Sequence, residues 1–109
     1  MKRGEVRWYI FAAPDKRRQV LILTRDSALA YLNEVTVAPI TRMHRAVPSQ
    51  VFLSTDEGLP QDSAVNLYHI QTVPQSKVGR LITTLAPGRM TEVEAAIRFA
   101  LGFAELRDR

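Results

Sequence analysis

Apolar residues recur at helical spacing in one long stretch of this chain, near its C-terminal end. The residues at these spacings of three and four are Met90, Val93, Ile97, Ala100 and Leu101. Pro87 suits the first helical turn, and Gly102 suits the residue after the helix ends. A stripe of this kind usually covers a sheet, so we expect one C-terminal helix that packs on strands.

The rest of the chain carries short apolar runs separated by turn signals, which predicts five or six short strands. The strand candidates are residues 5–11, 20–24, 34–40, 50–54, 63–67 and 77–85. The run from Val20 to Thr24 is typical of a strand buried on both faces, and Pro39 predicts interrupted pairing or an edge near the end of the third strand. Asp26 and Ser27 can begin a short helical turn. At 109 residues we expect a single domain over 1–109, a mainly β barrel of antiparallel strands closed by the helix.

The charge distribution favours an anionic partner. Fifteen Lys and Arg against eleven Asp and Glu give a net charge of +4 and a pI near 10. That balance serves solubility or nucleic-acid binding. The cations cluster at two strand ends, Lys16, Arg17 and Arg18 at one and Arg42 and Arg45 at the other. Only Gln19 separates the first cluster from the buried strand.

Several classes of protein are disfavoured. The chain has no cysteine, so disulfides, thiolate metal sites and a cysteine nucleophile are excluded. Its two histidines lack the spacing of metal ligands, and neither a Gly-rich phosphate loop nor a G-x-S-x-G elbow is present. We therefore expect no metal and no cofactor. The N-terminal residues are too polar for a signal peptide or membrane span, so we expect a cytoplasmic protein without membrane contact.

RNA strand scission is a reaction that needs only the cations, hydroxyls and histidines that this chain offers. The 2′-hydroxyl is the nucleophile, so the protein must move two protons and stabilise a dianionic phosphorane, which suits an arginine fork. Arg18 and Thr41 would share one rim if the strands at 20–24 and 34–40 pair antiparallel, although a solvated arginine and a loop threonine explain the spacing more simply. His44 and His69 offer an alternative acid/base pair.

Aromatic residues on the first strand candidate offer stacking surfaces for bases. They are Trp8, Tyr9 and Phe11. Because successive strand residues face opposite sides, we expect at least one of them in the core.

Five segments resemble, in order and spacing, the MazF/PemK family of toxin endoribonucleases. They are RGEVRWYIF (3–11), RRQVLILTRDSALAYL (17–32), VTVAPITR (35–42), LPQDSAVNLYHIQTV (59–73) and KVGRLITTLAPGRMTEVEAAIRFALGF (77–103). The resemblance implies an SH3-like barrel, a homodimer and an antitoxin partner whose C-terminal segment lies in the RNA groove. It implies metal-independent cleavage of single-stranded RNA to 2′,3′-cyclic phosphate and 5′-hydroxyl ends, which inhibits translation and growth.

The resemblance also assigns site residues. The family's catalytic arginine falls on Arg18 and its threonine or serine on Thr41. The expected RNA-facing surface spans 14–19, 41–49 and 66–71 and contributes Lys16, Arg17, Arg42, His44, Arg45 and His69. Gln19 stands where the family usually has proline, which leaves Arg17 as an alternative to Arg18.

A non-catalytic barrel is the alternative function, either an RNA-binding protein or a gyrase poison like the related CcdB toxins. The gyrase poisons carry a tryptophan on the terminal helix, whereas the single tryptophan here is Trp8. The sequence names neither the recognised RNA motif nor the class of RNA attacked.

Overall fold

The computed structural model describes residues 1–10 and 17–103. Its strands are β1 Glu5–Ile10, β2 Arg17–Ile22, β3 Glu34–Thr41, β4 Gln50–Leu53, β5 Ser63–Asn66, β6 Gln71–Pro74 and β7 Val78–Thr84. Its helices are α1 Asp26–Leu29, α2 Pro87–Ala100 and the 3-10 turns η1 Thr55–Glu57, η2 Leu67–His69 and η3 Gln75–Lys77. All strand pairs are antiparallel, in the order β4-β5-β3-β2-β1-β7 with β6 beside β3. The predicted class, mainly antiparallel β with a C-terminal helix, is confirmed.

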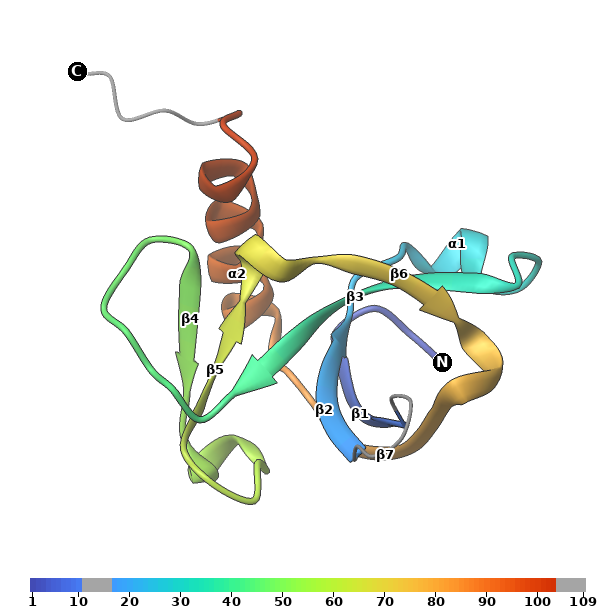
Figure 1. Ribbon diagram of the computed structural model, residues 1–109, viewed down its shortest axis with the longest axis horizontal. Helices are drawn as coiled ribbons and strands as arrows, with labels where there is room; N and C mark the ends of the chain where they lie inside the picture. The colour runs from blue at the N-terminus through green and yellow to red at the C-terminus, as the bar shows by residue number, and fades with distance from the viewer. Residues whose placement is uncertain (11–16, 104–109) are drawn as a thin grey trace.

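Strand β3 joins the two halves of the sheet. One of its edges pairs with β2. The other pairs with β6 over Glu34–Val37 and then with β5 from Ile40 (Figure 1). Pro39 lies between these two ladders, where its missing N–H removes no bond, so the predicted interruption is found there. Pro39 is not at an edge, because it pairs with Val20 of β2.

Two predictions about the strands need correction, the start of β2 and the absence of β6. β2 begins at Arg17 and not at Val20, because β1 pairs with it as far as Ile10↔Arg17. β6 was not expected at all: it is short and ends in a proline, and of its four residues only Val73 is buried. Its pairing with β3 joins residues far apart in sequence, so no local pattern indicates it.

The core confirms that β2 is buried on both faces. Val20, Leu21 and Ile22 are all fully buried. Leu21 packs in one apolar cluster with residues of β3, β4, β5 and α2, while Val20 and Ile22 pack in a second cluster. Tyr9 belongs to the second cluster, so the expectation that one N-terminal aromatic is core holds.

Helix α2 has the predicted ends. It begins at Pro87, and Gly102 follows its cap with a left-handed φ of 81°. The N–H of Gly102 donates to the carbonyl of Phe99 at 3.1 Å, and that of Phe103 to Arg98 at 2.7 Å, which satisfies the last carbonyls. Met90, Val93, Ile97 and Ala100 face the core as predicted, with Ala96 also buried, but Leu101 is exposed. None of the helices in the described residues is long and apolar enough to cross a membrane.

Candidate active site

A surface pocket of about 610 Å³ lies where β2 and β3 part. Strands β1, β2, β3 and β5 and the residues after β3 line it with Trp8, Arg17, Arg18, Gln19, Ile40, Thr41, Arg42, Met43 and Ser63. Three arginines, two residues with hydroxyl groups, a glutamine and a tryptophan therefore line one pocket.

The sheet register brings Arg18 and Thr41 to this pocket. The predicted antiparallel pairing of β2 with β3 is confirmed, and its last pair is Val20↔Pro39. Arg18 lies two residues before Val20, and Thr41 lies two residues after Pro39. Both residues are therefore at the same end of the paired strands, and both line the pocket. The juxtaposition expected from the sequence is therefore present.

The two neighbouring arginines have different surroundings. The guanidinium of Arg17 lies 4.2 Å from the centroid of the Trp8 ring, a cation–π contact that holds it against the indole. The backbone of Arg18 is anchored in β2 and pairs with Tyr9 of β1, but its side chain makes no hydrogen bond or ion pair within the described residues. In that part of the chain no acceptor competes with an anionic ligand for the guanidinium donors.

Thr41 has its hydroxyl oriented by the loop that follows it. Its Oγ1 accepts a hydrogen bond from the backbone N–H of Met43 at 3.1 Å. The hydroxyl proton has no acceptor among the described residues. Thr41 can therefore donate a hydrogen bond to a phosphate oxygen in the pocket.

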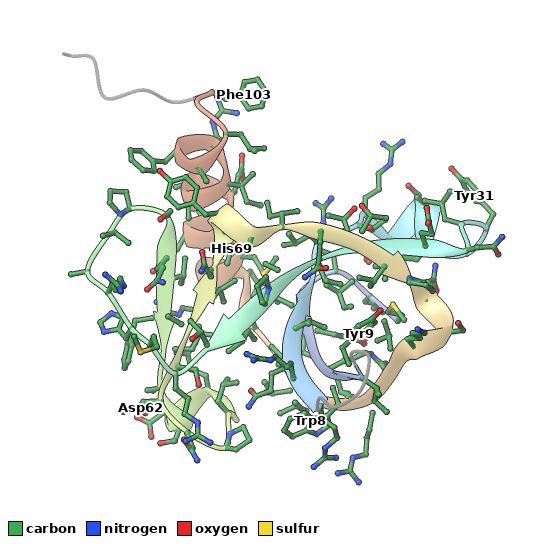
Figure 2. All side chains as sticks on the ribbon, in the orientation of Figure 1. Trp8, Tyr9, Tyr31, Asp62, His69 and Phe103 are labelled. Carbon is green, nitrogen blue, oxygen red and sulfur yellow. The ribbon has the colours of Figure 1, made fainter. Side chains whose placement is uncertain are left out.

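The other residues predicted to contact RNA do not all lie in this pocket. Arg42 lies in the same pocket, whereas Arg45 and His69 line a second pocket of about 420 Å³ together with Tyr68 and Phe99. In Figure 2 the labelled Trp8 and His69 lie well apart. Lys16 lies outside the described residues.

The histidine pair finds no support in this geometry. The ring of His44 packs 4.7 Å from the ring of Phe52 and lines neither pocket, while His69 lies in the second pocket. An acid/base pair would need both rings at one phosphate. The arginine–threonine scheme is the one that a single pocket accommodates.

Gln19 and Met43 lie within the segments predicted to face RNA, although neither was assigned a role, and Ser63 was not predicted at the site. Ser63 is buried, and its hydroxyl donates to the carbonyl of Gln61 at 2.9 Å. It reaches the pocket because β5 pairs with the end of β3, a contact that no local motif signals. Within the described chain, no group of three or more potential ligands could hold a metal ion.

The fold defines a class of protein. The structure superposes with a TM-score of 0.85 on an endoribonuclease from a mycobacterial species solved in complex with its cognate antitoxin, covering 96% of this chain and 98% of that chain at 21% identity. It also superposes with a TM-score of 0.78 on the Mycobacterium tuberculosis toxin MazF-mt6, at 38% identity over 88% of this chain and 96% of that one. The fold is thus that of the MazF toxins.

The sequence places the chain within that class. Residues 2–101 match the family described as PemK-like, MazF-like toxin of type II toxin-antitoxin system. A curated relative, the probable endoribonuclease MazF2 of Mycobacterium tuberculosis, is 37% identical over 103 residues, which cover 94% of this chain and 99% of the relative. The chain belongs to the MazF/PemK family of toxins.

Proposed function

We propose that this MazF-type toxin endoribonuclease cleaves single-stranded RNA by attack of the 2′-hydroxyl on the adjacent phosphate. The 2′-oxygen bonds to phosphorus and loses its proton, while the bond to the 5′-oxygen breaks and that oxygen gains a proton. The products carry a 2′,3′-cyclic phosphate and a 5′-hydroxyl, and loss of intact RNA inhibits translation and growth. The observation that carries this proposal is the meeting of Arg18 and Thr41 in one cationic pocket.

Arg18 is the proposed phosphorane stabiliser. Its planar donors match two phosphate oxygens, and its position within a paired, core-anchored strand fixes the backbone from which the guanidinium extends. An arginine is a poor base because its ordinary pKa lies far above neutrality. We therefore assign Arg18 to charge stabilisation and to proton donation toward the leaving oxygen.

The positive lining of the pocket supports cleavage without a metal ion. Arg17, Arg18 and Arg42 disfavour a divalent cation at the position of the phosphate and supply the compensating charge themselves. Arg17, held on Trp8, would contribute attraction to the RNA backbone. Lys16, next to it in sequence, is assigned the same role.

Replacing Thr41 with valine is expected to lower the rate of RNA cleavage roughly 10- to 100-fold, because a hydrogen bond to a charged oxygen is lost. The Thr41→Ser variant keeps the hydroxyl that accepts from Met43 and donates to the phosphate, so it should retain most of the activity. Single-turnover cleavage of a short RNA measures the rate of each variant. Equal losses in the two variants would contradict a role for the hydroxyl.

The second pocket is the proposed site for a flanking nucleotide. Arg45 can contact the backbone, and Tyr68 is 61% exposed, which suits stacking on a base. His69 borders the same pocket and would read a base edge.

The His69→Gln variant is expected to change the preferred RNA sequence by about 10-fold in relative preference at one position, with a smaller change in rate at the best site. End mapping on a long RNA measures both quantities. The same substitution at His44, which packs on Phe52, should shift the preference less. Complete loss of cleavage in His69→Gln would contradict a role in base reading.

We also propose the assembly typical of this family. Two copies would form a homodimer whose pockets share one channel, and a cognate antitoxin would cover that channel with its C-terminal segment. The structural relative solved with its cognate antitoxin has the same fold and supports the antitoxin partner. Because the proposed substrate is cellular RNA, the protein would act in the cytoplasm.

Incubation of the purified protein with a long unstructured RNA in EDTA tests the function. We expect discrete cuts at a short recurrent motif. Intact RNA, from folded protein separated from any antitoxin, would overturn the proposal and would leave a binding module with the same barrel.

A further inference from the structure

One residue of the pocket, Gln19, has a side-chain oxygen without a hydrogen-bond partner. The Oε1 of Gln19 is buried and has no donor, and it is the only buried side-chain nitrogen or oxygen in the described residues of which this is true. A buried acceptor without a donor costs free energy in the folded protein. Such an atom at a site calls for a functional explanation.

The position of Gln19 joins this atom to the proposed RNA site. Gln19 follows Arg18 in β2, pairs with Trp8 of β1, and lines the pocket with both of them. The residue as a whole is partly exposed and lines the pocket, although its amide oxygen is covered. The terminal torsion of glutamine is broad, so a modest rotation turns this oxygen toward an arriving donor.

The chemistry of the surroundings indicates which donor is absent. The pocket that Gln19 lines also includes Ile40 and Met43, apolar side chains that suit the face of a flat base more than a second phosphate. Arg18 and Thr41 are assigned to the scissile phosphate, and because Gln19 lines the same pocket we place an adjoining base beside Gln19. A nucleobase amino group offers the N–H that Oε1 lacks.

We propose that Gln19 is a specificity-determining residue that accepts a hydrogen bond from the exocyclic amino group of an unpaired base next to the scissile phosphate. The proposal rests on the proposed RNA-cleaving function and deepens it. Binding of a base with an amino group removes the cost of the unsatisfied acceptor. Uracil presents a carbonyl oxygen, which repels an acceptor, where cytosine carries its amino group, and it can donate only from the ring N3–H between its two carbonyls. The protein therefore prefers adenine, cytosine or guanine over uracil at one position of its site.

The first test is a binding selection that needs no cleavage. A random library of short single strands with 2′-fluoro sugars, which cannot be cut by 2′-hydroxyl attack, is bound to the wild type and to Gln19→Leu, and the bound strands are sequenced. We expect wild type to disfavour uracil about 10-fold at one position and Gln19→Leu to lose this preference there, with other positions unchanged. The same preference in both proteins, or no position that disfavours uracil in wild type, overturns the proposal.

The second test removes the amino group alone. At the selected position, adenine is replaced with purine, guanine with inosine or cytosine with 2-pyrimidinone, and dissociation constants are measured by fluorescence anisotropy. Wild type should lose about 10-fold in affinity, and Gln19→Leu should lose little, because the partner of the amino group is already gone. An equal loss in both proteins overturns the proposal.

Further variants guard against an indirect effect of the substitution. Gln19→Leu should have a melting temperature no lower than that of wild type, because the substitution removes a buried unsatisfied acceptor. If Gln19→Leu does not fold, Gln19→Met takes its place in both tests. Gln19→Glu keeps an acceptor of the same shape and should restore the preference against uracil at lower overall affinity for RNA. Because neither test depends on cleavage, intact RNA in the EDTA assay would overturn the proposed function and leave the role of Gln19 to be decided by these results.

Discussion

Replacing Arg18 with alanine is expected to lower RNA cleavage by at least about 100-fold, the loss typical when a donor to a charged transition state is removed. The reason is geometric. The side chain of Arg18 has no hydrogen-bond or ion-pair partner in the described part of the chain, so its charge remains available to the phosphate. Its backbone pairs with Tyr9 of β1 and leads directly into the buried part of β2. Single-turnover cleavage of an RNA oligonucleotide measures the effect.

The neighbouring arginine provides the matched control. Arg17→Ala removes the same charge from the same pocket, but that guanidinium rests on Trp8, so we expect weaker, more salt-sensitive RNA binding with most of the catalytic rate retained. Arg18→Lys keeps the charge without the planar guanidinium, so its rate of RNA cleavage should lie between those of wild type and Arg18→Ala.

Two outcomes would contradict this assignment. One is a larger loss of rate in Arg17→Ala than in Arg18→Ala. The other is an unfolded Arg18→Ala protein, because an exposed cation contributes little to stability. Circular dichroism of each variant, recorded before the kinetics, checks the second.

Replacing Leu21 with alanine is expected to lower the free energy of unfolding by about 2–5 kcal/mol, the range for truncating a buried leucine. Leu21 is fully buried in the core cluster that unites β2 with β3, β4, β5 and α2. The cavity would lie directly under the strand that positions Arg18. Urea denaturation followed by tryptophan fluorescence or circular dichroism measures the change.

The control removes the same atoms from the surface. Leu32 is 45% exposed, so Leu32→Ala should cost much less than Leu21→Ala. A loss below about 1 kcal/mol in Leu21→Ala would show that the core relaxes around β2, and β2 would then not be the rigid anchor proposed for Arg18.

Local sequence patterns predicted much of the fold. The continuous apolar run around Leu21 predicted a strand buried on both faces, and helical spacing with Pro87 and Gly102 predicted α2. β6 escaped prediction because it is short and its place is set by pairing with β3. The start of β2 was missed for a related reason, since charged Arg17 and Arg18 enter the strand by pairing with β1.

The site was predictable where it depends on neighbouring strand ends. Arg18 and Thr41 meet because consecutive strands pair antiparallel, which the short connection favoured. The amide of Gln19 gave no signal, because an unsatisfied acceptor can be recognised only once the packing around it is known. The separation of His69 from the main pocket likewise depends on how η2 packs against α2 and β3.

The most direct test of the central claim is a single 2′-deoxy substitution at the mapped cleavage site of a short RNA, assayed in EDTA with the unmodified RNA alongside. The account predicts that the unmodified RNA is cut to a 2′,3′-cyclic phosphate and a 5′-hydroxyl and that the substituted RNA remains whole, because the nucleophile is part of the substrate. Cleavage of the substituted RNA at the same position would show that another nucleophile attacks the phosphate and would contradict the roles proposed for Arg18 and Thr41.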